Sequence, residues 1–279
     1  MDNNKLIKIS SITKKLLVAL FGTFLMVFLL FHACANLFIL AHDGGDAYSA
    51  FCHFMGTNVI VKVFEILLLA CFLLHIVLAL YLGIKNAKNR PVAYHERSKT
   101  RTAKGSKLMM ITGSLLLVCL LFHFYDFYFV KLNISKGVYM VKTEQLVVDD
   151  MNPEISPEAQ KVRMDAVQNH NVSDDMKWVR NITPDEKAIL QEAFPKAEIE
   201  PDFYHQARIK FQHWHVVLVY LIFFAVVGIH LRHGFESAMQ TFGLNHYKYS
   251  KLVSVLGIIY CWVICIIFTI TPVGVFFGL

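Results

Sequence analysis

Charged residues are scarce in this chain: Asp, Glu, Lys and Arg make up 17% of its 279 residues, whereas hydrophobic residues make up 56%. The mean hydropathy is correspondingly high, at +0.48. Soluble globular domains contain about 25% charged residues, and disordered chains contain fewer apolar residues than this one. The composition therefore excludes a soluble globular protein and a disordered chain, and it is typical of a protein with several membrane-spanning segments.

Cysteine motifs are missing as well. The six cysteines form no CxxC or CxxCH pattern, which argues against a zinc ribbon, an iron–sulfur site and a covalently attached c-type haem. A disulfide scaffold is excluded too, because most of the cysteines lie inside apolar stretches, where we expect small buried residues. These five are Cys34, Cys71, Cys119, Cys261 and Cys265.

Long apolar runs are what the sequence has instead. A helix needs roughly 20 mostly apolar residues to cross a membrane, where it must satisfy its own backbone hydrogen bonds. Five segments qualify, so we predict an all-α membrane protein with five transmembrane helices. The predicted spans are Leu16–Leu40, Val59–Gly83, Lys107–Lys131, His213–Glu236 and Leu252–Phe276.

Lysine and arginine are unevenly distributed among the connections between these spans. The segment 84–107 carries eight of them against the single Glu96, and four lysines precede the first span. Because cationic segments of this kind are retained in the cytoplasm, we expect the N-terminus and segment 84–107 to be cytoplasmic. The C-terminus and segment 132–212 are then extracytoplasmic.

Segment 132–212 is polar and net acidic, unlike the rest of the chain. Pro157 and Pro184 each follow a Ser or Thr and precede acidic residues, which favours the first turn of a helix. We therefore predict a small helical insert outside the membrane. The chain would then divide into spans one to three (1–131), the insert (132–212), and spans four and five (213–279).

Four histidines lie inside the predicted spans. His32 and His123 stand past the middle of spans that run outward, whereas His75 and His230 stand past the middle of spans that run inward. A helical rise of 1.5 Å per residue separates the two sets by about 13–15 Å in depth, one on each side of the membrane midplane. Ionisable residues inside a membrane are costly, so these are candidates for function.

An internal repeat relates the first and third spans. Residues 22–32 read GTFLMVFLLFH and residues 113–123 read GSLLLVCLLFH, with seven of eleven positions identical. Each glycine precedes its histidine by ten residues, or about 15 Å, which is the depth of His75 and His230. A glycine at that depth leaves room for a large flat group, and the repeat supports pairing the histidines by depth.

Two opposed neutral imidazoles, with no carboxylate or thiolate beside them, suit the axial positions of a b-type haem. Pairing by depth joins His32 with His123 and His75 with His230, which predicts two haems b; zinc or di-iron would need more ligands. Two alternatives stay open. The histidines could be four unrelated polar contacts or the proton relay of a transporter, although the spans show no inverted repeat and no broken half-helix.

Longer stretches around these histidines resemble one known family. They read GTFLMVFLLFHACANL in the first span, EILLLACFLLHIVLALYLG in the second, GSLLLVCLLFHFYDF in the third and GIHLRHGFESAMQTFGLNHYKY at the end of the fourth, together with Arg90-Pro91-Val92. The chain thereby resembles the cytochrome b membrane-anchor subunit of the diheme succinate dehydrogenase and fumarate reductase family, especially forms found in Bacteroides-like bacteria.

The resemblance implies that the first four helices form a bundle that holds two haems b. His233 competes with His230 as the ligand from the fourth helix; we prefer His230, because the family's ligand stands four residues before a glycine, here Gly234. The implied axial ligands are His32, His75, His123 and His230.

The resemblance also implies partners at a bacterial inner membrane. They are a quinone, usually menaquinone, an iron–sulfur subunit, and a cytoplasmic flavoprotein that interconverts succinate and fumarate. This chain would be the electron-transfer and quinone-reactive subunit, with the His75–His230 haem facing the iron–sulfur subunit and the His32–His123 haem facing the quinone. It encodes no dicarboxylate chemistry of its own, and no nucleic-acid partner is expected.

Three further residues are candidates for a site. Glu65 stands ten residues before the histidine of the second span and could exchange protons with the quinone, or it could pair with Lys62. Arg232 could neutralise a haem propionate, or simply mark the cytoplasmic end of its helix. Asn36, one turn past the histidine of the first span, could support the outer haem or hydrogen-bond a neighbouring helix.

The chain departs from the family in two places. Some members carry a glutamate two residues before the fourth ligand, where this chain has Gly228. The family joins its third and fourth helices by a short connection, where this chain has the insert, which could cap the quinone entrance or contact another protein. A haemless structural anchor is a third hypothesis, beside the redox subunit and the histidine-relay transporter.

Overall fold

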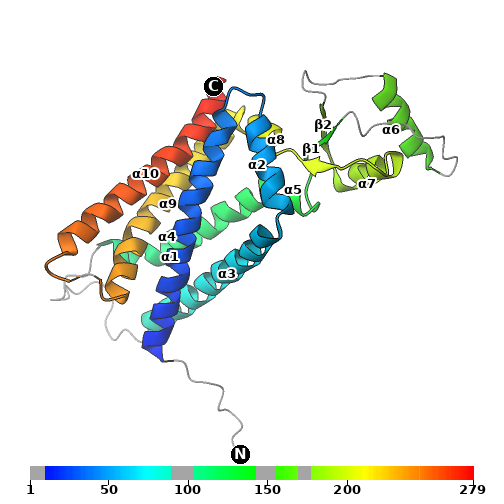
Figure 1. Ribbon diagram of the computed structural model, residues 1–279. Coiled ribbons are helices and arrows are strands. Elements are labelled where there is room, and N and C mark those ends of the chain that lie inside the picture. The colour runs from blue at the N-terminus through cyan, green and yellow to red at the C-terminus, as the bar shows by residue number, and fades with distance from the viewer. Residues whose placement is uncertain (1–9, 89–103, 143–154, 169–176, 245) are drawn as a thin grey trace, which may run out of the picture. The chain divides into compact units, whose positions relative to one another are not determined.

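Five long apolar helices dominate the structure of this chain (Figure 1). The computed structural model describes residues 10–88, 104–142, 155–168, 177–244 and 246–279. Each of the five helices is long and apolar enough to cross a membrane, which confirms the predicted all-α membrane fold. They are α1 (Ser11–Asn36), α3 (Val59–Lys88), α4 (Lys104–His123), α9 (Trp214–Thr241) and α10 (Ser250–Phe277).

Shorter elements extend two of these helices. The 3₁₀ turn η1 (Leu37–Leu40) follows α1, whereas α4 is followed by the π-helical turn η2 (Phe124–Tyr128) and the short helix α5 (Phe129–Lys131). The helix α3 continues past its predicted end to Lys88. The middle of the basic segment 84–107, from 89 to 103, lies outside the described residues.

A further helix, α2 (Asp46–Thr57), connects the first two spans and was not predicted. Asp43 fixes its first turn, because its carboxylate accepts hydrogen bonds from the backbone N–H groups of Ala47 (2.8 Å) and Gly45 (2.9 Å). These two bonds lower the pKa of Asp43. The Asp-Gly-Gly-Asp sequence at 43–46 was the signal for this helix start.

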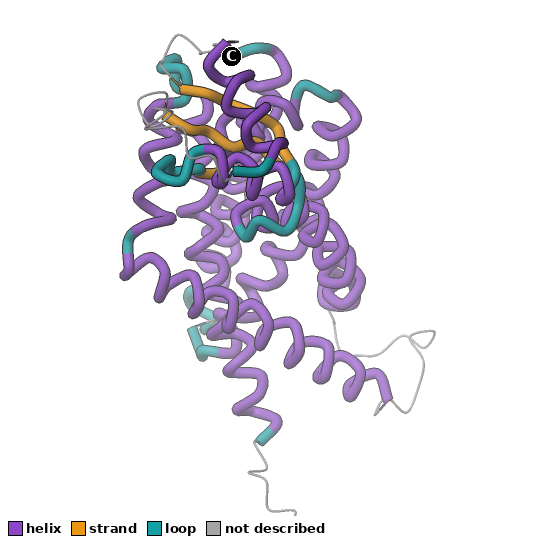
Figure 2. The backbone as a smooth tube through the Cα atoms, turned by 90° about the vertical axis from the view of Figure 1, so that its right-hand side faces the viewer, coloured by secondary structure: helices purple, strands orange, loops and turns teal. Residues whose placement is uncertain are grey.

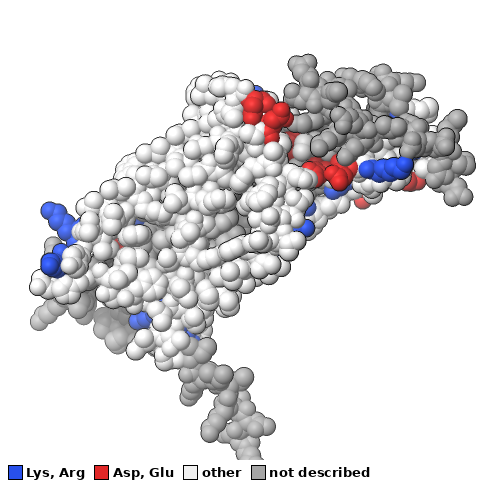
Figure 3. Space-filling model, viewed as in Figure 1, with Lys and Arg blue, Asp and Glu red and all other residues white. Residues whose placement is uncertain are grey.

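The chain divides into two units. The first comprises Met1–Phe38, His53–Leu117 and Leu218–Val273, and so contains α1, α3 and most of α4, α9 and α10. Figure 3 shows almost no charged side chain along the helices of this unit on the face in view, and Lys and Arg gather where α10 begins. An uncharged lateral surface of this kind is what a lipid environment requires.

The second unit comprises Ile39–Cys52, Val118–Val217 and Gly274–Leu279, and it includes the insert. Three antiparallel strands form a small sheet in the order β2-β1-β3 (Figure 2). Three helices accompany the sheet. The strands are β1 (Gly137–Lys142), β2 (Lys177–Ile182) and β3 (Glu200–Pro201), and the helices are α6 (Pro157–Gln168), α7 (Pro184–Ala193) and α8 (Phe203–Phe211).

Both predicted helix starts in the insert are confirmed. The helix α6 begins at Pro157 and α7 at Pro184, where Thr183 and Glu186 form a reciprocal capping box. The expectation of a helical insert was nevertheless incomplete, because it missed the sheet and α8. A buried cluster that includes Tyr139 joins strand and helices into a core, so the insert is a folded structure and not a loose connection.

Candidate functional site

The imidazole of His75 lies against Gly22 of α1. A Cβ atom placed on Gly22 would be 3.0 Å from His75 Cε1, so a side chain at this position would crowd the ring. His75 Nδ1 is 3.2 Å from the main-chain oxygen of Val18, one turn earlier in α1. Because a carbonyl oxygen can only accept, Nδ1 carries the proton and Nε2 keeps its lone pair.

His230 makes the corresponding contact with α4. A Cβ atom on Gly113 would be 3.3 Å from His230 Cε1, and His230 Nδ1 is 3.2 Å from the hydroxyl of Thr112. The hydroxyl donates its own proton to the main-chain oxygen of Leu108 at 3.0 Å. It must therefore accept from Nδ1, which again leaves Nε2 of His230 with a lone pair.

These two contacts confirm that each repeat glycine lies at the depth of the histidines from the other two helices. Metal-ligating histidines usually donate their second ring N–H to a protein oxygen, which fixes the ring and its tautomer. Both residues satisfy that requirement through Nδ1, so their Nε2 atoms are suited to the axial positions of a haem iron.

Aromatic rings surround His32 in the first unit. The ring of Phe28 stacks on His32 at 5.4 Å between centroids, and Phe268 of α10 lies 5.8 Å away. His123 belongs to the second unit, where Phe127 lies 5.2 Å from its ring. The pairing of His32 with His123 stays a prediction, because each residue is placed only within its own unit.

Arg232 lies in the C-terminal half of α9 and faces α10. Its guanidinium forms an ion pair with Glu236 at 2.5 Å and donates to the hydroxyl of Ser254 at 3.0 Å. The main-chain oxygen of Asn36 accepts from Thr271 of α10 at 3.4 Å. The structure therefore assigns a helix-packing contact to both residues, and their predicted roles beside a haem stay predictions.

Glu65 lies in α3, ten residues before His75, and is partly exposed. Gly228, where some members of the family that the sequence resembles carry a glutamate, packs against α10. A Cβ atom there would lie 2.7 Å from the sulfur of Cys265, whose thiol donates to the main-chain oxygen of Phe224 at 3.4 Å. A side chain at 228 would therefore push α9 and α10 apart, which is a physical reason for glycine at this position.

Sequence reasoning missed the two groups that bond to the imidazoles of His75 and His230. Thr112 directly precedes the repeat glycine of α4, and this position was a usable signal, because a hydroxyl within a span must find a partner. No sequence signal could have identified the carbonyl of Val18, because every residue has a main-chain carbonyl.

Among the described residues, no three His, Cys, Asp or Glu side chains are grouped so that they could hold a metal ion by themselves. Comparisons of the chain with protein-family models, with curated proteins and with solved structures found no match.

Proposed function

We propose that this chain is the membrane-anchoring, diheme cytochrome b subunit of a succinate:quinone oxidoreductase. It passes electrons between menaquinone and a cytoplasmic pair of iron–sulfur and flavoprotein subunits. The observation that carries the proposal is the matched arrangement of His75 and His230, each set against a repeat glycine with Nδ1 bonded to a protein oxygen.

The residues around this pair favour axial ligation of an iron. Gly22 and Gly113 let the imidazoles approach the helix backbone, and the Nδ1 bonds hold each ring so that Nε2 is the ligating atom. Hydrogen-bond donation from Nδ1–H to a protein oxygen raises the basicity of the imidazole, which would favour the ferric state of a bound iron. A bound haem would supply one-electron transfer.

The remaining sequence candidates complete the proposal. His32 and His123 form the second pair, Glu65 exchanges protons with the quinone, and the N-terminus is cytoplasmic in a bacterial inner membrane. The distribution of charge supports this orientation: the exposed Lys248, just before α10, and Lys251, in the first turn of α10, fall on the same predicted cytoplasmic side as segment 84–107. The insert and the C-terminus are then extracytoplasmic.

An absorption spectrum of the purified chain tests the proposal. We expect reduced b-type bands and about two haems per chain. His75→Ala and His230→Ala should each remove the same single haem, while the control His233→Ala keeps both.

A histidine-relay transporter or a haemless anchor would instead purify without b-type bands. A colourless protein after haem-replete expression would contradict the proposal. So would equal loss of both haems in a His75→Ala variant that is still folded.

A further inference from the structure

The π-helical turn η2 begins directly after His123. Such turns are rare; they occur mostly as single turns inside α-helices, and they are frequent at functional sites. Two consecutive main-chain oxygens of this turn accept hydrogen bonds from side chains outside it. Tyr125 O accepts from the hydroxyl of Ser135 at 3.0 Å, and Asp126 O accepts from the amide of Gln206 at 2.8 Å.

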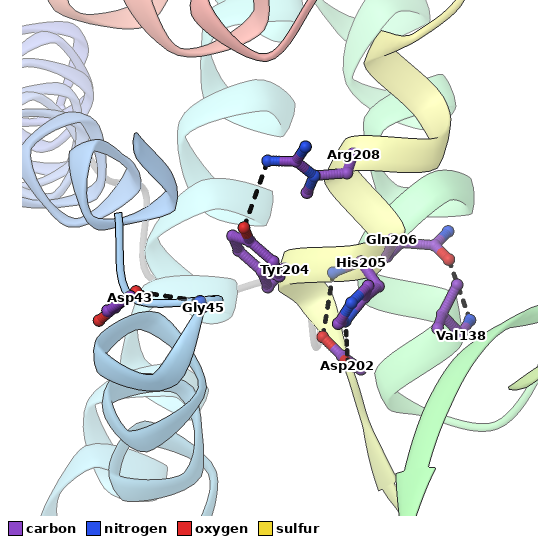
Figure 4. Close-up of polar contacts among 8 residues, drawn as sticks. All are labelled: Asp43, Gly45, Val138, Asp202, Tyr204, His205, Gln206 and Arg208. Atoms are coloured by element: carbon purple, nitrogen blue, oxygen red, sulfur yellow. Dashed lines mark hydrogen bonds and ion pairs between the residues drawn. The ribbon is translucent and has the colours of Figure 1, made fainter. Parts of the chain in front are cut away.

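Gln206 joins the turn to the sheet of the insert. Its side chain is buried in α8, with only 3% of its surface exposed. The amide nitrogen donates to Asp126 O, and the amide oxygen accepts from the backbone N–H of Val138 in β1 at 3.0 Å (Figure 4). Each half of a buried amide thus has a partner, so removing either bond leaves a buried polar group unsatisfied.

Two more side chains of α8 contact the same turn. Lys210, one helical turn after Gln206, forms an ion pair with Asp126 at 2.5 Å. The ring of Phe211 lies 6.5 Å from the ring of Phe127, which in turn lies 5.2 Å from His123. One helix of the insert therefore contacts the turn through an amide, an ammonium group and an aromatic ring.

The helix α8 is itself anchored to the sheet. Asp202, 2% exposed, caps α8 by accepting from His205 N at 3.0 Å, and its own backbone N–H donates to Val138 O at 2.8 Å. The imidazole of His205 also bonds to the Asp202 carboxylate at 2.6 Å (Figure 4). The start of α8 is thereby tied to the residue of β1 that also binds the Gln206 amide.

We propose that the insert is a clamp: through α8 it holds the π-helical turn η2 and so sets the orientation of the His123 imidazole. Gln206 is the main positioning residue. The importance of that orientation rests on the proposed function, in which His123 ligates a haem. Without the clamp, the turn can return to α-helical hydrogen bonding, and Phe127 then moves relative to the ring that it packs against.

The sharpest test is Gln206→Glu in the full chain. A carboxylate can still accept from Val138 N, but it cannot donate to Asp126 O. A second variant, Lys210→Met, removes the ion pair and leaves the amide in place. The matched control is Gln191→Glu, because the Gln191 amide also donates to main-chain oxygens of the insert, the closest being Ala197 O at 3.1 Å, but none of them belongs to η2.

Two readouts are measured on each variant. The first is hydrogen exchange of the amides in 124–131, which we expect to be about five- to tenfold faster in Gln206→Glu, with a smaller increase in Lys210→Met and none in Gln191→Glu. The second is the redox potential and electron paramagnetic resonance signal of each haem. A separate variant, His123→Ala, identifies the haem that depends on His123. In Gln206→Glu the redox potential and the signal of that haem should change, while those of the other haem stay as in the unmodified protein.

Unchanged exchange in Gln206→Glu would overturn the clamp, as would an equal change in both haems. Faster exchange with both haems unaltered would overturn the positioning of His123 in particular. If the unmodified protein contains no haem, the proposed function is wrong, and the exchange rates alone then decide whether α8 holds the turn.

Discussion

The two repeat segments, 22–32 and 113–123, start from nearly the same sequence and differ at both ends. At the glycine end, α1 offers the main-chain oxygen of Val18 to an imidazole, whereas α4 offers the hydroxyl of Thr112. At the histidine end, α1 stays α-helical to Asn36, whereas α4 passes into a π-helical turn contacted by the insert.

The difference shows that the repeat specifies where the imidazoles lie but not what holds them. The carbonyl one turn before Gly113 is that of Met109, and the Thr112 hydroxyl lies 3.2 Å from its oxygen. A hydroxyl stands between backbone and imidazole in α4, while the contact is direct in α1. Histidines at equivalent places are thus held by acceptors of different strength.

The largest effect should come from filling the repeat glycines. Gly22→Ala should lower the stability of the chain by about 1–3 kcal/mol, because the added methyl group displaces the His75 ring. If the proposed function is correct, it should also reduce the content of the haem assigned to His75. Gly113→Ala should lower the stability by less. Its Cβ atom would lie 3.3 Å from His230 Cε1, whereas the Cβ atom of Gly22→Ala would lie 3.0 Å from His75 Cε1. Unfolding in mixed detergent micelles measures both changes.

The control for these variants is Gly56→Ala in α2, where nothing lies within 4 Å of an added Cβ atom. Its stability should be unchanged or slightly higher, because alanine favours a helix. Equal losses in all three variants would show that the glycines do not serve the imidazoles.

A smaller effect should follow from Thr112→Val. The variant removes the acceptor of His230 Nδ1–H and should destabilise the chain by about 1 kcal/mol. Under the proposed function it should also raise the midpoint potential of the haem assigned to His230, because the ligand becomes less electron-donating. A redox titration of the purified protein measures the potential, and Thr112→Ser should restore it.

Thr23→Val is the matched control for Thr112→Val, since the Thr23 hydroxyl donates to Ala19 O in the same way at 2.9 Å, within α1 alone. Its haem potentials should equal those of the unmodified protein. If the haem potentials shifted equally in Thr23→Val and Thr112→Val, the effect would not come from the bond to His230, and the two repeat segments would not differ in this respect.

The smallest effect concerns a contact that α1 makes with the fifth helix. The Tyr260 hydroxyl donates to Met26 O at 2.6 Å. Tyr260→Phe should lower stability by roughly 0.6 kcal/mol, the average for such bonds between membrane helices. Thermal unfolding checks this against Tyr247→Phe, whose side chain is 86% exposed. Identical melting temperatures for the two variants would mean that the bond contributes nothing.

Much of the fold follows from the order of residues alone. Hydropathy along the chain located all five spans, because a membrane of fixed thickness selects runs of fixed length. The same 1.5 Å rise placed Gly22 level with His75 and Gly113 level with His230, and both contacts are present. The starts of α6 and α7 were visible in their capping residues, which act within one turn.

Tertiary structure alone decided which atoms hold each histidine. Whether an imidazole finds the Val18 carbonyl or the Thr112 hydroxyl depends on how neighbouring helices pack, and periodicity contains no such information. The hydrogen bond from Gln206 to the π-helical turn likewise joins residues 80 positions apart. Depth is a property of one helix and can be counted along the chain, whereas a hydrogen-bond partner is a property of two segments that have come together.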